Sequence, residues 1–221
     1  MGKIICIETS TALCSVALCS TEGEVLEYAE AAEPRSHASQ TAVLVEKVLK
    51  GMKVSECAAV ALSSGPGSYT GLRVGSSTAK GLCFGGGIPL IAVPTLDVLA
   101  RQAVEEGLPC SRIIPMVDAR RMEVYCAEYS PEGRRLTEVR SMVVENGVFG
   151  DSSQTLFIGD GAAKCEDALG AGRFVQCCPK ASAMAAPAAE AFREGRFEDV
   201  AYFEPFYLKD FVATVSRKQL F

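Results

Sequence analysis

The sequence lacks tryptophan, contains a single histidine, and has no two of its ten cysteines in a Cys-x-x-Cys arrangement. Structural zinc sites are built mostly from closely spaced cysteine and histidine ligands, so we expect the chain to hold no metal ion. Several cysteines lie inside apolar runs, where cysteine behaves as a small buried side chain. Free buried cysteines are typical of a reducing compartment, and we therefore predict a cytoplasmic protein.

No run of apolar residues is long enough to span a membrane, and basic residues do not outnumber acidic ones. The 22 lysines and arginines against 27 aspartates and glutamates give a net charge of −5, which argues against independent tight binding to nucleic acid. With 221 residues, of which 48% are hydrophobic, the chain can form one large or two small globular domains. One local group of arginines is interpreted as a solvated face in preference to the alternative, an RNA site: Arg120, Arg121, Arg134, Arg135 and Arg140.

A glycine-rich stretch, residues 65–75, follows an apolar run of strand length and precedes a segment without proline up to Pro89. This pattern predicts a strand, a tight turn and a helix. Its spacing is not that of a phosphate loop, because no Lys-Ser or Lys-Thr follows Gly71, nor that of a dinucleotide-binding turn, whose third glycine would fall on Thr70. Two interpretations stay open: a structural turn that starts a helix, or an anion-binding turn made of Gly65, Gly67 and Ser68.

Two predicted helices, residues 36–51 and 71–84, have a wider apolar surface than one contact with a sheet requires. Small residues four apart in the second helix would let another backbone come close. One interpretation is that a partner helix covers the remaining surface, and the other is burial between two layers of the same chain. For the first interpretation, the candidate interface residues are Ala38, Thr41, Ala42, Val45, Leu49, Gly71, Leu72, Gly75, Thr78, Ala79 and Leu82.

The order of predicted elements repeats along the chain. The first part predicts strands at 3–9, 15–20 and 24–29, the helix 36–51, a strand ending at residue 62, the glycine turn with its helix, a strand at 89–93 and a helix at 95–106. At a constant offset of 110 residues, Asp118 matches Glu8 at the end of a first strand, and residues 130–133 match residues 20–23 at a hairpin turn. Further helices are predicted at 162–169 and 181–194.

The repeat predicts an α/β fold of two related half-domains, each a mixed sheet with helices in the order strand, strand, strand, helix, strand. We assign residues 1–100, together with about 200–221, to the first half-domain and residues 101–199 to the second. The last residues are expected to pack back on the first half.

A duplicated half with an acidic end to its first strand and a glycine turn before a helix resembles the actin, sugar-kinase and Hsp70 superfamily. Within it, the chain resembles the TsaB (YeaZ) family over nearly its whole length. The glycine stretch, residues 64–75, is the most specific motif. Supporting motifs occur in the matching order at residues 80–82, 93–96, 118–125 and 205–208.

This resemblance implies a subunit of the bacterial machinery that makes N6-threonylcarbamoyladenosine on tRNA, next to the anticodon. The family pairs with a paralogue, TsaD, which holds the metal and transfers the threonylcarbamoyl group, and an ATPase, TsaE, joins the pair. The resemblance also implies a homodimer when the chain is isolated, through the two apolar helices. The expected role is a noncatalytic scaffold with no cofactor of its own, ATP and a metal ion on the partner subunits, and tRNA bound only indirectly through the complex.

Two enzymatic alternatives stay open beside the scaffold. One is a nucleotide-binding phosphotransferase of the same superfamily, with Glu8 or Asp118 near a metal-bound nucleotide. The weaker one is a metalloprotease-like hydrolase, but the paralogue's pair of histidines four apart is represented here only by His37, with Thr41 in the second place. We interpret His37 as a helix-start or surface residue, and we assign no catalytic residue.

Overall fold

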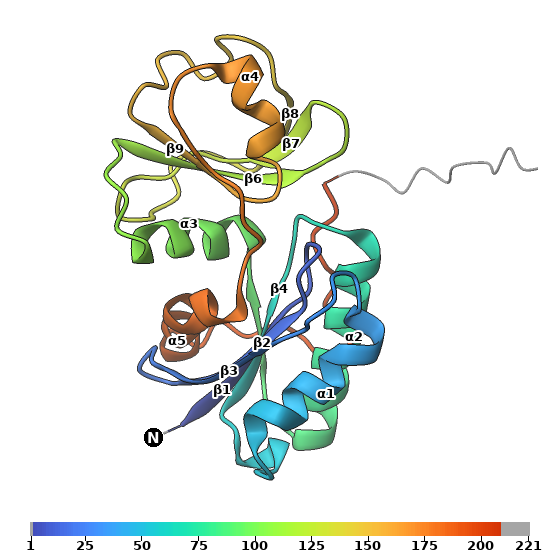
Figure 1. Cartoon of the computed structure of the whole chain (residues 1–221). Coiled ribbons are helices and arrows are strands. Elements are labelled where there is room, and N and C mark those ends of the chain that lie inside the picture. The colour runs from blue at the N-terminus through green and yellow to red at the C-terminus, as the bar shows by residue number, and fades with distance from the viewer. Residues whose placement is uncertain (1, 209–221) are drawn as a thin grey trace, which may run out of the picture.

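The computed structural model describes residues 2–208 and contains two five-stranded mixed sheets, one in each half of the molecule (Figure 1). In each half the first strand is central, with the second strand antiparallel on one side and the fourth parallel on the other. The first sheet runs β3 (Val25–Glu30), β2 (Ser15–Ser20), β1 (Lys3–Glu8), β4 (Ala59–Ser63), β5 (Leu90–Val93). The second runs β8 (Arg140–Val143), β7 (Glu123–Cys126), β6 (Arg112–Asp118), β9 (Thr155–Ile158), β10 (Arg173–Val175).

The identical strand order confirms the predicted fold of two related halves, and the likeness extends to single hydrogen bonds. Ser20 Oγ accepts hydrogen bonds from two backbone N–H groups of its turn, at 3.2 and 3.1 Å, and Ser130 Oγ accepts two at 3.3 Å. Gly23 and Gly133 occupy the left-handed region, with φ of 94° and 81°. The two turns therefore use the same residue types for the same local geometry.

The second half departs from the predicted pattern because it lacks the long helix expected between its third and fourth strands. Residues 144–154 form turns and irregular chain. Between β9 and β10 the structure has only a 3₁₀ turn (Ala163–Cys165) and the four-residue helix α4 (Glu166–Leu169). The first half alone, among the residues described, carries two long helices on one face of its sheet.

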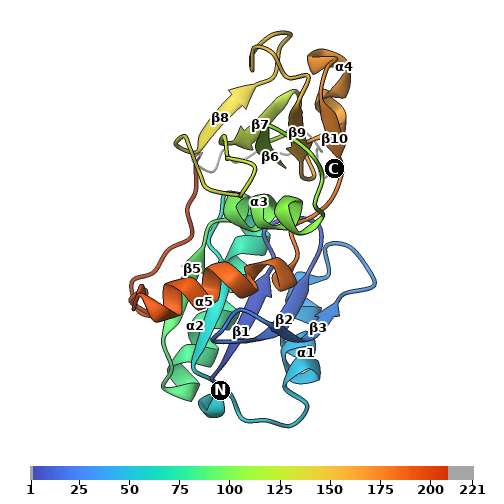
Figure 2. The same ribbon diagram turned by 90° about the vertical axis from the view of Figure 1, so that its left-hand side faces the viewer.

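Those two helices, α1 (His37–Leu49) and α2 (Tyr69–Gly86), pack side by side on one face of the first sheet (Figure 1). A short 3₁₀ turn (Val54–Glu56) connects α1 toward β4. The opposite face is covered by a 3₁₀ turn (Ala181–Met184) and helix α5 (Ala185–Arg193), as Figure 2 shows. Each face has its own buried apolar cluster, so the sheet is buried on both sides.

Two helices pack across the boundary that we placed at residue 101. Helix α3 (Thr95–Glu105) contributes Leu96 and Leu99 to the apolar cluster of the second sheet. Helix α5 contributes its alanines to the first sheet instead. Beyond α5, Phe203 joins the cluster beneath α1 and α2, and the Phe206 N–H donates to the Ser64 carbonyl at 2.7 Å. The described part of the chain after residue 200 thus packs on the first half, while residues 209–221 lie outside the described residues.

None of the helices in residues 2–208 is both long and apolar enough to cross a lipid bilayer.

Leu72 on α2 is 1% exposed, whereas Val43 on α1 is 53% exposed. We predict that Leu72→Ala lowers the free energy of unfolding by about 2–5 kcal/mol, because it leaves a cavity under α2. Val43→Ala, which removes an apolar side chain from solvent, should change it by less than about 0.5 kcal/mol. Urea denaturation measures both, and equal effects would contradict the packing described for α2.

Candidate protein-interaction surface

The glycine turn before α2 is filled by the chain's own loop between β1 and β2. The Ser68 N–H donates to the Ser10 carbonyl at 2.6 Å, and a Cβ on Gly67 would collide with the same carbonyl oxygen. Ser68 caps the amino end of α2, since its Oγ accepts a hydrogen bond from the Gly71 N–H at 3.3 Å. Gly65 has a φ of 108° and would collide with the Phe206 carbonyl if it bore a side chain. An anion at this turn would have to displace backbone, so the geometry supports a structural turn.

The glycines along α2 are also explained by close contact with the loop between β1 and β2. A Cβ on Gly71 would collide with the Thr9 carbonyl oxygen, and one on Gly75 would collide with Thr9 Oγ1. These glycines let the chain's own loop come close to the helix. The close approach inferred from the sequence is therefore present, but the approaching backbone belongs to the same molecule.

The candidate interface residues divide by burial. Seven are enclosed by the chain itself and offer no surface to a partner: Thr41, Val45, Leu49, Gly71, Leu72, Gly75 and Ala79. Ala38 and Ala42 are exposed on α1, and Thr78 and Leu82 are half-buried on α2. The helical wheel places residues on a face, but it does not show which face the sheet covers. The neighbouring Val74 and Gly81 on α2, half-buried and exposed respectively, belong to the same uncovered side.

The charged residues of α2 are turned to its other flank. Lys80 Nζ donates to the carbonyls of Ala201 at 3.0 Å and Phe203 at 3.1 Å, and the Arg73 guanidinium lies 4.2 Å from the centre of the Tyr69 ring. Lys80 is thus held to the segment that follows α5, and Arg73 lines a cavity together with Glu204, Pro205 and Tyr207 of that segment. The two helices share an uncharged patch of small and apolar side chains, bordered on α1 by the exposed Glu46, which we call the α1–α2 surface: Ala38, Ala42, Val74, Thr78, Gly81 and Leu82.

Glu8 at the end of β1 is fully buried between the halves. Its Oε1 accepts hydrogen bonds from the Ser10 N–H at 2.6 Å and from Ser63 Oγ at 2.9 Å. Within residues 2–208 no donor reaches its Oε2. Burial raises the pKa of Glu8 from about 4.5 to about 7, although the hydrogen bonds from Ser10 and Ser63 oppose this shift.

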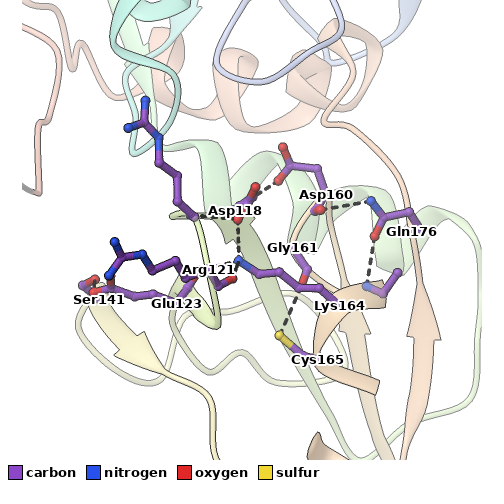
Figure 3. A network of polar contacts seen from close by, with 11 residues as sticks. Asp118, Arg121, Glu123, Ser141, Asp160, Gly161, Lys164, Cys165 and Gln176 are labelled. Atoms are coloured by element: carbon purple, nitrogen blue, oxygen red, sulfur yellow. Dashed lines mark hydrogen bonds and ion pairs between the residues drawn. The ribbon is translucent and has the colours of Figure 1, made fainter. Parts of the chain in front are cut away.

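Asp118, the counterpart of Glu8, is engaged by a lysine (Figure 3). Lys164 Nζ contacts Asp118 Oδ1 and donates to the carbonyls of Arg121 and Glu123, both at 2.7 Å. The adjoining Asp160 accepts a hydrogen bond from the Asp118 N–H at 2.9 Å, and burial raises the pKa of Asp160. A metal ion held by Asp118 would compete with the Lys164 ammonium. Among residues 2–208 there is no group of three or more histidine, cysteine, aspartate or glutamate side chains placed to hold one.

His37 is the first residue of α1 and is 7% exposed, so it begins a helix but is not a surface residue. Its Nε2 lies 2.9 Å from the Thr11 carbonyl. Thr41, in place of a second histidine, donates its hydroxyl to the His37 carbonyl at 2.7 Å. The imidazole thus ties α1 to the loop after β1. Sequence reasoning missed the role of this loop, whose pattern Thr9-Ser10-Thr11 gives no periodic signal.

The raised pKa of Glu8 makes a testable prediction about pH. The folded state keeps the proton that the unfolded state loses, so this group stabilises the fold below about pH 4.5 and its contribution is lost as pH rises toward 7. We predict that Glu8→Gln, which keeps an oxygen for the Ser10 and Ser63 donors, gains up to about 3 kcal/mol relative to the unmodified chain between pH 5 and pH 8. Urea unfolding at a series of pH values measures the difference. Parallel pH curves for the two proteins would contradict the assignment.

Comparison with known proteins shows which family the chain resembles. A family model described as "TsaD: tRNA N6-adenosine threonylcarbamoyltransferase" matches residues 30–202. The tRNA threonylcarbamoyladenosine biosynthesis protein TsaB of Escherichia coli is 32% identical over 226 residues, which cover 96% of each chain. Its namesake in Bacillus subtilis is 32% identical over 139 residues, 62% of this chain and 58% of that protein.

Solved structures show the same fold. YeaZ from Pseudomonas aeruginosa superimposes with a TM-score of 0.78 at 29% identity, over 94% of this chain and all of that one. The activator of 2-hydroxyisocaproyl-CoA dehydratase from Clostridium difficile, at 8% identity and a TM-score of 0.52 over 88% of this chain and 96% of its own, shares the fold alone. On these similarities, the chain belongs to the TsaB (YeaZ) family of tRNA threonylcarbamoyladenosine biosynthesis proteins.

Proposed function

We propose that the chain is a noncatalytic scaffold subunit that binds and stabilises a TsaD paralogue through the α1–α2 surface. The observation that carries the proposal is an uncharged surface on two adjacent long helices, from which both cations of α2 are turned away. Burying such a surface costs little desolvation of polar groups. Small side chains at Ala38, Ala42 and Gly81 would let partner helices pack closely.

The size of a stable interface limits what this surface contributes. A specific protein complex buries roughly 800 Å² on each partner, which is more than six small and medium side chains provide. The partner must therefore extend beyond the α1–α2 surface, and two exposed apolar side chains on the same helices, Val43 and Phe84, are available for this. Phe84, at 87% exposed, is of the residue class that is enriched in the centre of interfaces.

Two features favour a noncatalytic role over a phosphotransferase. The Ser10 carbonyl fills the glycine turn that would face phosphates, and Lys164 engages the carboxylate that would hold a metal. On this proposal the chain has no cofactor of its own, while ATP and a metal ion act on the partner subunits, with TsaE joining the pair. The isolated chain would pair with a second copy through the α1–α2 surface, in the cytoplasm, and tRNA would reach it only within the complex.

Charge on the α1–α2 surface should abolish pairing. We predict that Ala42→Arg and Gly81→Arg each reduce co-purification with the TsaD paralogue by at least tenfold, because a buried unpaired guanidinium opposes association. Both sites are exposed, and a Cβ on Gly81 meets nothing within 4 Å. Gly75 is unsuitable, since its Cβ would collide with Thr9.

Ala171→Arg provides the matched control, because Ala171 is an exposed alanine of the second half. It should leave pairing unchanged. Thermal melting of each variant establishes that the fold is intact. Undiminished pairing of both Ala42→Arg and Gly81→Arg, with melting temperatures close to that of the unmodified chain, would reject the proposed surface.

The noncatalytic role predicts that the purified chain binds no ATP with micromolar affinity, with or without Mg²⁺. Isothermal titration calorimetry of ATP into the isolated chain tests this directly. A stoichiometric binding isotherm would revive the phosphotransferase alternative, and loss of that isotherm in Asp118→Ala would locate the site.

A further inference from the structure

The turn between β6 and β7 carries two adjacent arginines in a backbone conformation that disfavours them. Arg120 has a φ of 71° and Arg121 a φ of 50°. This left-handed region is occupied at lowest cost by glycine and asparagine. Backbone energetics alone would therefore favour residues such as Asn-Gly at these two positions. The two arginines must then contribute something through their side chains.

The turn is fixed by more contacts than a hairpin connection needs. Lys164 bonds the carbonyls of Arg121 and Glu123, and it also contacts Asp118 (Figure 3). Asp118 Oδ1 in turn accepts a hydrogen bond from the Arg120 N–H at 2.9 Å. A lysine from a different element is thus used to hold a strained turn in place. Such over-determination of a strained segment is found where the segment itself is functional.

The carboxylates around the turn already have partners. Asp118 pairs with Lys164, Asp160 accepts the Asp118 N–H, and Glu123 accepts a hydrogen bond from the Ser141 hydroxyl. Arg120 and Arg121 are both exposed. The turn therefore carries two consecutive, exposed arginines on a rigid base, in a protein whose net charge is −5.

We propose that the Arg120–Arg121 turn binds phosphate groups of the tRNA backbone when the chain is part of the complex described under Proposed function, on which this inference rests. Guanidinium groups form paired hydrogen bonds with phosphate oxygens. Two such contacts are too few to hold RNA on an acidic protein by themselves at physiological salt. The turn would therefore act as an auxiliary contact that orients tRNA already held by the partner.

An RNA ligand is favoured over an acidic protein by the position of the turn and by the family. The turn lies on the second half of the molecule, whereas α1 and α2 cover the first sheet (Figure 1). The chain belongs to a family whose named members make a modified nucleoside in tRNA. Phosphate is the anion that tRNA presents at every residue, so the turn needs no base sequence to engage it.

The double variant Arg120→Asn with Arg121→Gly tests the proposal, because both new residues favour the existing backbone. It should leave the melting temperature of the isolated chain unchanged or higher. In the complex with the TsaD paralogue, the Kd for a tRNA transcript should rise about tenfold or more. The slope of log K against log salt should fall in magnitude by about 1.5 to 2, as two phosphate contacts are lost.

The control is Arg173→Gln with Arg193→Gln, which removes the same charge from two exposed arginines elsewhere. It should change neither the Kd nor the salt slope by a comparable amount. An unchanged Kd and slope in the turn variant would overturn the proposal. Loss of co-purification with TsaD at an unchanged melting temperature would also overturn it, because the turn would then be a protein contact.

If no complex forms even with the unmodified chain, the proposed function is rejected independently of the proposal about the turn. The turn is then tested on the isolated chain at about 10 mM salt, where electrostatic binding is strongest. The turn variant must bind the transcript more weakly than the control variant. Equal binding would reject the turn as an RNA contact.

Discussion

The structure depends on the close approach between the loop after β1 and the first turns of α2. Thr9 and Ser10 lie so near the helix that Gly67, Gly71 and Gly75 have no room for a side chain. The Ser68 N–H bonds to the Ser10 carbonyl, so the start of α2 is fixed to the central strand. This contact explains Gly67, Gly71 and Gly75 and fills the glycine turn with the chain's own backbone. It also sets the position of α2 beside α1, where the uncharged surface forms.

Much of the fold could be predicted from the sequence, because strands, turns and the 110-residue repeat have periodic or local signals. The candidate interaction surface is harder to predict from the sequence. A helical wheel cannot tell a face covered by its own sheet from one that awaits a partner, so Leu72 and Ala79 were grouped with Ala42. Small residues four apart permit close approach by any backbone, and here that backbone is Thr9. In the second half no helix forms at 144–154, where Gly147 and Gly150 both adopt positive φ.

The two halves share the same strand order, but the acidic residues at the ends of their first strands, Glu8 and Asp118, have different environments. In the first half Glu8 is enclosed with its hydroxyl and amide donors, and two long helices cover the sheet. In the second half, within residues 101–199, no helix lies between β8 and β9, and the helix after β9 has only four residues. Asp118 there contacts Lys164, which holds the turn between β6 and β7. The first half thus carries the packed helices α1 and α2, while the second half carries the exposed Arg120–Arg121 turn.

The covering of the first sheet by late parts of the chain has a consequence for biosynthesis. One face of β1 is sealed by α5, and the cluster on the other face includes Phe203. The amino-terminal strands leave the ribosome first, and α1 and α2 follow early, but the face that α5 covers stays without this cover until residues 185–193 have been translated. A nascent chain therefore exposes one apolar face of the first sheet during much of elongation, and chaperones would matter most in this interval.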